Sequence, residues 1–205
     1  VGEYLHEVLW SKVACSIHLS GTLTTVGGMA PYLRESGLDR TEGVKTVSVE
    51  SPFDYEKQGQ LIVPQGVVNP KDSEGHTKWL IEWLPAMIER NGAGEGILVL
   101  FTSFKQMKEV AEGVPSWVGD LLLRQDQLSR REILERHEAA INDGRKSVIM
   151  ASASFEEGVD LRGSLCTMVV LAKLQFQVPN DPVSEELKEY MESQGRSFFV
   201  EVAVP

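Results

Sequence analysis

Residues 154–160, Ser-Phe-Glu-Glu-Gly-Val-Asp, bring together the side chains of this chain that are best suited to chemistry. The apolar run 147–151 comes just before them, and another strand-like run follows. Glu157, Gly158 and Asp160 are therefore expected on a loop at the end of a strand, where open α/β sheets usually carry their catalytic groups. The alternative is an ordinary acidic loop in which Asp160 caps the turn that follows.

A second polar segment follows the apolar run 96–101, which leads into Thr102, Ser103 and Phe104 and then into a helical pattern. Because the carboxyl ends of parallel strands meet at one edge of a sheet, this segment and the first can share one rim. A structural interpretation stays open as well. In it, Ser103 is the N-cap of the next helix and the neighbouring phenylalanines fill the core.

The elements that position these segments are clearest from residue 96 onward. Strand and helix patterns alternate there, which predicts parallel strands with covering helices. The helix that starts at Ser129 has a capping box with Glu132 and a stop at residues 142–144. The expected strands are 96–101, 119–123, 147–151 and 166–172, and the expected helices are 103–112 and 129–142.

The flanking regions are less regular. One further polar segment, Ser20-Gly21-Thr22-Leu23, follows the apolar run 13–19. Gly37 is typical of a helix C-cap, Pro85 of a kink, and Asp181 of an N-cap. The expected strands are 13–19, 44–49, 60–64 and 197–204. Helices are expected around residues 5–9 and at 29–36, 74–91 and 185–194.

Composition indicates a soluble, globular and cytosolic protein. The 205 residues are 42% hydrophobic and 24% charged, and no apolar run reaches the roughly 18 residues of a membrane helix. The net charge of -10 predicts weak binding of nucleic acid by this chain alone, because non-specific affinity comes mainly from Lys and Arg at phosphates. A groove with backbone N–H groups and small hydroxyls can still hold a single strand.

Metal and redox chemistry are not expected in this chain. Cys15 and Cys166 both lie in strand-like runs, so we expect buried free thiols, and two cysteines are too few for an iron-sulfur cluster. The four histidines lack metal-ligand spacing. The glycine-rich stretch 92–96 precedes a strand rather than following one, so it is interpreted as a linker and not as a phosphate-binding loop.

In chain order, the segments 20–23, 102–104 and 154–160 resemble helicase motifs III, IV and V of the DinG/XPD branch of superfamily 2. The family patterns read S-A-T-L, F-x-S and S-F-x-E-G-x-D. Residues 51–59 and 175–183 also look like DinG sequence, so the resemblance covers nearly the whole chain. It implies a RecA-like, P-loop-NTPase-type parallel sheet with helices on both faces.

The resemblance also implies roles for individual residues. Motif V would give Glu157, Gly158 and Asp160 the catalytic coupling role between nucleotide and DNA, with Asp160 bonded to the ribose or to a basic group. Motif III would relay between lobes, although Gly21 replaces the usual Ala. The motif III relay residues are Ser20 and Thr22. The DNA-backbone contacts would be Thr102, Ser103, Phe104 and Ser154, with Gln125 and Arg130 as weaker candidates because Asp126 stands where the family has Gly.

Several motor parts of such a helicase are missing from the sequence. It has no G-x-x-x-x-G-K-[ST] and no Asp-Glu-x-His, and it ends before the family's Q-x-x-G-R-x-x-R motif with its arginine finger. We therefore expect residues 1–43 to be the trailing part of a first lobe, including motif III, and residues 44–205 to be a second lobe that ends before motif VI. The ligands of ATP and Mg²⁺, and the iron-sulfur cluster that whole family members often carry, would lie on the first lobe.

The leading functional prediction is the second lobe of a monomeric, cytoplasmic, ATP-dependent 5'-3' DNA helicase that acts on single-stranded DNA, with its own first lobe as partner and no membrane. The isolated fragment is predicted not to hydrolyse ATP. One alternative is a non-catalytic docking or regulatory module derived from such a lobe. Another is an unrelated nucleotide-binding Rossmann enzyme, which the lack of a glycine fingerprint after any strand disfavours.

Overall fold

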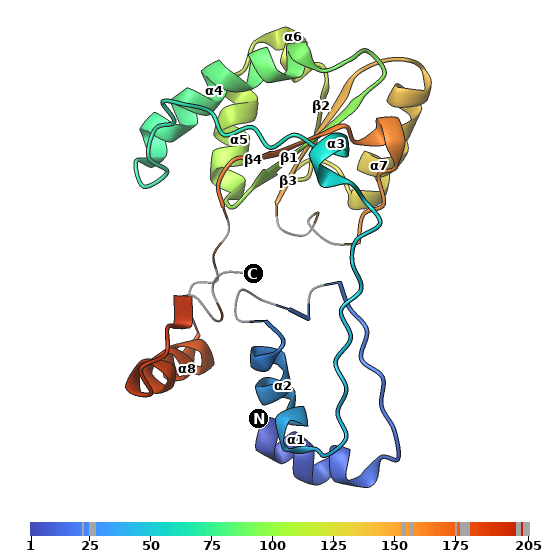
Figure 1. The fold of residues 1–205 in the computed structure, drawn as a ribbon. Coiled ribbons are helices and arrows are strands. Elements are labelled where there is room, and N and C mark those ends of the chain that lie inside the picture. Colours follow the sequence, from blue (N-terminus) through green and yellow to red (C-terminus); the bar gives the residue numbers. More distant parts are fainter. Residues whose placement is uncertain are drawn as a thin grey trace. The chain divides into compact units, whose positions relative to one another are not determined.

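The chain forms two compact units (Figure 1). One consists of residues 1–61 together with 176–205, and the other of residues 62–175. The computed structural model describes residues 1–21, 23–24, 28–152, 155, 158–174, 176, 181–199 and 202.

A four-stranded parallel sheet forms the centre of the unit 62–175, as the alternating pattern predicts. The strand order is β2-β3-β1-β4, and β1 therefore lies between β3 and β4. In register, Gly96 lies opposite Ser147, Ile97 opposite Met168, and Leu122 opposite Val148. The strands are β1 (Gly96–Phe101), β2 (Leu122–Arg124), β3 (Ser147–Ser152) and β4 (Met168–Leu171).

Helices cover both faces of this sheet, which confirms the predicted fold class. Alternate residues of a strand point to opposite faces, so the buried runs of β1 and β3 supply two separate cores. Val99 and Phe101 pack with α4 and α5 on one face, whereas Leu98 and Leu100 pack with Ile133 of α7 on the other (Figure 1). The helices are α4 (Ser73–Arg90), α5 (Phe104–Gly113), α6 (Ser116–Gly119) and α7 (Arg130–Asn142), with a 3₁₀ turn η4 (Gly163–Leu165) before β4.

Each long helix of this unit begins at a side-chain cap. Asp72 accepts a hydrogen bond from the Gly75 N–H at the start of α4, and Ser103 accepts one from the Gln106 N–H at the start of α5. The predicted helix at 74–91 is present, and α4 continues through Pro85 to Arg90.

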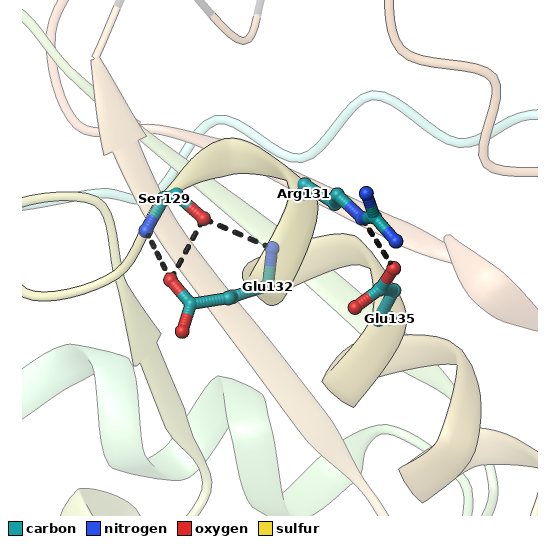
Figure 2. A network of polar contacts seen from close by, with 4 residues as sticks. All are labelled: Ser129, Arg131, Glu132 and Glu135. Carbon is teal, nitrogen blue, oxygen red and sulfur yellow. Dashed lines mark hydrogen bonds and ion pairs between the residues drawn. The ribbon is translucent and has the colours of Figure 1, made fainter.

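The predicted capping box of α7 is present (Figure 2). Ser129 Oγ accepts from the Glu132 N–H and donates to Glu132 Oε2, which also accepts from the Ser129 N–H at 3.0 Å. These bonds to Ser129 lower the pKa of the Glu132 carboxyl below its usual value. The helix start is thus held by a reciprocal pair.

Replacing Ser129 with alanine should lower the free energy of unfolding by about 1 kcal/mol, the usual effect of losing an N-cap. Because the folded-state pKa of Glu132 is depressed, its contribution is present above the unfolded value of 4.5 and is lost as the pH falls through the folded value. The difference between wild type and variant should therefore shrink below about pH 4.5, as urea unfolding across pH can test. Arg131→Ala, which removes only the exposed pair with Glu135, is the control and should change little. A difference independent of pH would contradict the role given to Glu132.

The other unit contains α-helices and 3₁₀ turns. Gly37 ends α2 in the left-handed conformation, with φ of 73°, as its sequence predicts. Asp181 caps α8 and Pro182 fills its first turn, also as predicted. The elements are α1 (Gly2–Val8), η1 (Trp10–Lys12), α2 (Ala30–Ser36), η2 (Leu38–Arg40), α3 (Tyr55–Gln58) and α8 (Pro182–Ser193).

Four predicted strands are wrong. Residues 13–19, 44–49 and 60–64 form no strand of a sheet, and the described residues of 197–204 in the C-terminal run include helical positions at 198, 199 and 202. A strand needs a hydrogen-bonded neighbour as well as an apolar sequence. Ile17 and Leu61 are 80% and 91% exposed, so the apolar side chains of these runs have no core to enter.

The cysteine prediction is also partly wrong. Cys15 is exposed, because the run that contains it is not a buried strand, whereas Cys166 is half-buried and free. Burial raises the pKa of the Cys166 thiol, so it stays protonated at neutral pH. Across the described part of the chain, no group of three or more His, Cys, Asp or Glu side chains is arranged to hold a metal ion. Nor does any described helix have the length and apolar character needed to cross a membrane.

Candidate functional site at the carboxyl edge of the sheet

The end of β1 passes directly into α5. Phe101 is fully buried, Thr102 is exposed, and Ser103 is the N-cap of α5 with its Oγ 3.4 Å from the Gln106 nitrogen. The capping interpretation of Ser103 is therefore right, whereas Phe104 is 50% exposed and does not fill the core. The exposed Thr102 and Phe104 leave a hydroxyl and an aromatic ring in solvent beside a helix N-terminus.

Behind this junction lies a buried polar cluster that sequence analysis did not find. Gln106 Nε2 donates to His76 Nδ1 at 3.0 Å and to Thr77 Oγ1 at 3.2 Å, which ties the start of α5 to the start of α4. Burial, with a smaller effect of the Lys173 charge, lowers the pKa of His76, so this imidazole is neutral at neutral pH and can accept the bond. The pattern of α4 marks His76 only as a position on its core-facing side.

The end of β3 is joined to the turn after β2. Gln125 Oε1 accepts hydrogen bonds from the Ser152 N–H at 2.8 Å and from Ser152 Oγ at 3.1 Å. The Gln125 N–H in turn donates to the Met150 carbonyl at 3.1 Å. Ser152, the last residue of β3, is thus fixed just before residues 154–160, the predicted coupling loop.

The described residues of that loop are anchored in the core. Phe155 is 2% exposed and packs in the cluster that contains Ile133 of α7. The Arg130 guanidinium lies over the Phe155 ring, 5.3 Å from its centroid. Gly158 has φ of +70°, and a β-carbon there would lie 3.3 Å from Arg130 Nη2. The predicted site residues Ser154 and Glu157 lie outside the described residues.

Asp160 has a basic partner within its own loop. Its Oδ2 accepts from Arg162 Nε at 2.7 Å, and the bond to Arg162 lowers the pKa of the Asp160 carboxyl. The Asp160 side chain is 65% exposed. It does not cap η4, which begins with no side-chain cap. Asp160 is therefore a charged carboxylate in solvent, paired with a neighbouring guanidinium.

The sheet brings most of the predicted site residues to one edge. Because the four strands are parallel, the segments that follow β1, β2 and β3 all leave at the carboxyl edge. The residues placed there are Thr102, Ser103, Phe104, Gln125, Arg130 and Gly158, whereas Asp160 lies farther along the crossover that leads to β4. Ser20 is exposed and belongs to the unit of residues 1–61 and 176–205, and Thr22 lies outside the described residues.

A parallel α/β sheet covered on both faces is the architecture of a RecA-like lobe. The chain belongs to the helicase C-terminal domain family, whose model matches residues 88–205.

Relatives match over the whole chain and confirm the predicted DinG resemblance. The chain is 33% identical over 211 aligned residues to the ATP-dependent DNA helicase DinG of Photobacterium profundum, covering all of this chain and 30% of that protein. It is 32% identical to DinG of Salmonella paratyphi A and 29% identical to DinG of Escherichia coli K12, covering 29% of each. The chain therefore spans about 30% of the length of the curated relatives it matches.

Proposed function

We propose that this chain supplies the second motor lobe of an ATP-dependent 5'-3' DNA helicase that moves on single-stranded DNA. The observation that carries the proposal is the gathering of the motif IV and motif V segments at the carboxyl edge of one parallel sheet. Exposed Thr102 and the N-terminus of α5 offer neutral donors to a DNA backbone, and Gly158, beside Arg130, lies on the same edge with Asp160 two residues farther along the chain. The direction of movement and the preference for single strands rest on the family resemblance.

Nucleotide chemistry would be shared with the rest of the parent protein. A Mg²⁺ site needs several oxygen ligands, and the described residues contain no group of three acidic or histidine side chains that could supply them. Two cysteines do not fit an iron-sulfur cluster either. By the family resemblance, we place ATP, Mg²⁺ and any cluster on a first lobe, of which residues 1–43 would be the trailing part. The parent is proposed to act as a cytoplasmic monomer.

The test is ATP hydrolysis by the full-length parent with and without single-stranded DNA. The Asp160→Ala variant should lose DNA stimulation by about tenfold or more, the effect of removing one charged contact that matters in the transition state. Because the Asp160–Arg162 pair is exposed, folding should change little. Asp143→Ala is a matched control, since Asp143 pairs with Arg145 two residues on and is equally exposed, yet lies beyond the C-terminus of α7.

A second candidate function comes from the charge of the chain. The net charge of -10 is unfavourable for nucleic-acid binding and suits a docking or regulatory module. An intact parent without DNA-stimulated hydrolysis would support this module and refute the motor. Equal losses in Asp160→Ala and Asp143→Ala would leave the motor standing but remove Asp160 from the coupling site.

A further inference from the structure

The geometry points to Gln125 as a positioning residue that sets the start of the coupling loop by completing the hydrogen-bond ladder of β3. This inference rests on the proposed function and deepens it. It assigns Gln125 an action through Ser152, whereas a DNA contact would require its amide to reach the phosphate backbone. The two actions use opposite ends of the same carboxamide, so they can be separated.

The ladder between β2 and β3 ends one residue too early to satisfy Ser152. Leu122, Leu123 and Arg124 pair with residues 148–150 of β3, and the Gln125 N–H adds a last backbone bond to the Met150 carbonyl. The chain then turns away, because the N–H groups of residues 127 and 128 bond back to the Arg124 carbonyl. In the register set by the bond from the Val148 N–H to the Leu121 carbonyl, the Ser152 N–H would next meet the Gln125 carbonyl, and Gln125 Oε1 takes that place at 2.8 Å.

The orientation of the Gln125 carboxamide follows from this contact. A backbone N–H can only donate, so the atom that faces Ser152 N must be the oxygen. The same oxygen accepts from Ser152 Oγ at 3.1 Å. Gln125 Oε1 thus takes the place of a strand carbonyl as the hydrogen-bond acceptor for the last residue of β3.

The turn that carries Gln125 is itself held firmly. Arg124 donates from Nε and Nη2 to the two carboxylate oxygens of Asp126, at 3.0 Å and 2.7 Å. Both side chains are largely shielded, with 11% and 24% exposed, so this bidentate pair is screened less than a surface pair. The Arg124–Asp126 pair therefore stabilises the turn from which the Gln125 side chain reaches the end of β3.

The same stretch of chain reaches the loop at a second point. Arg130, five residues after Gln125, lies over the Phe155 ring and beside Gly158. Residues 124–130 thus hold the start of the coupling loop through Ser152 and its middle through Phe155. Displacement of a catalytic group by about 1 Å can cost a hundredfold in rate, so loss of either hold should impair coupling.

The experiment uses the full-length parent with Gln125→Met, which keeps the volume and removes both the acceptor and the donor, and Gln125→Glu, which keeps the acceptor. We expect Gln125→Met to lower the maximal DNA-stimulated rate of ATP hydrolysis by about tenfold to a hundredfold. Its affinity for single-stranded DNA should stay within about twofold of wild type. Gln125→Glu should restore most of the rate, because a carboxylate oxygen accepts the same two bonds. Gln127→Met, on the same turn and exposed, is the matched control.

Two results would overturn the inference. One is an unchanged rate in Gln125→Met. The other is an equal loss of DNA affinity in both Gln125 variants at raised salt, which screens the added charge and would make the amide a DNA contact instead.

Hydrogen exchange at the Ser152 amide separates failure of this inference from failure of the proposed function. Exchange should be faster in Gln125→Met than in wild type, whether or not the parent is a motor. Faster exchange in a parent without DNA-stimulated hydrolysis would refute the proposed function and leave the ladder contact standing. Unchanged exchange would refute the contact.

Discussion

Phe155→Ala is expected to lower the free energy of unfolding of the unit 62–175 by about 3–5 kcal/mol, the usual range for a fully buried aromatic residue. Phe155 is 2% exposed and packs in the α7-side core with Leu100 and Ile133. The truncation would remove the ring under the Arg130 guanidinium as well. Because the ring anchors the proposed coupling loop to this core, the proposed DNA-stimulated ATPase rate of the parent should fall together with stability. Urea unfolding of the chain and ATP hydrolysis by the parent measure the two effects.

Two further variants separate packing from position in the prediction for Phe155. Phe155→Leu keeps most of the apolar volume and loses the aromatic face, so it should cost about 1–2 kcal/mol, less than the alanine variant. Phe104→Ala removes the same side chain from a half-exposed site and should cost about 1 kcal/mol or less. Equal losses at residues 155 and 104 would show that Phe155 is not an anchor in the core.

Gly96→Ala should be nearly as damaging, at about 3 kcal/mol or more. A β-carbon on Gly96 would lie 2.0 Å from the Leu165 carbonyl oxygen and 2.6 Å from His137 Nε2. His137 is fully buried, donates from Nε2 to that carbonyl at 2.7 Å and accepts at Nδ1 from Ser147 Oγ at 2.8 Å. The added methyl group would overpack the site, at about 1–3 kcal/mol, and break a buried hydrogen bond, at about 1–3 kcal/mol more.

Gly119→Ala is the matched control for Gly96→Ala. Apart from its chain neighbours and the backbone of its own helix, no described atom lies within 4 Å of a β-carbon at Gly119, so alanine there should be neutral or slightly stabilising in urea unfolding. If both glycine variants unfolded at the wild-type urea concentration, the close approach of Gly96 to His137 and Leu165 would be wrong.

The sheet of the unit 62–175 could be predicted from sequence because its signals are local. Two continuous apolar runs became the buried strands β1 and β3, and the Ser129–Glu132 pair became a capping box. β2 was displaced, with Leu122–Arg124 in place of 119–123, because residues 116–119 form a short helix. Strand length there is set by pairing with β3, which no local pattern reports.

The remaining misses depend on contacts between distant residues. The run 13–19 has the composition of a strand, but composition cannot supply the neighbour that a strand requires. The acceptor role of Gln125 depends on the register of β2 against β3 and on where the ladder ends. The bond from Gln106 to His76 spans 30 residues and appears only when α4 and α5 lie side by side. For the candidate site, sequence motifs could therefore predict which residues to examine but not what each one contacts.

The strand order β2-β3-β1-β4 has a consequence for synthesis on the ribosome. β1 is made first, yet both of its partners come later, and the last residue of β4 follows Phe101 by 70 residues. At translation speeds of about 5–20 residues per second, that interval lasts roughly 4–14 s. During this time one or both edges of the nascent β1, with its run of Ile, Leu, Val and Phe, are unpaired, because β3 and then β4 are still to be made. This interval is when the chain is most open to aggregation and to capture by chaperones, so slow translation between residues 101 and 171 would prolong the risk.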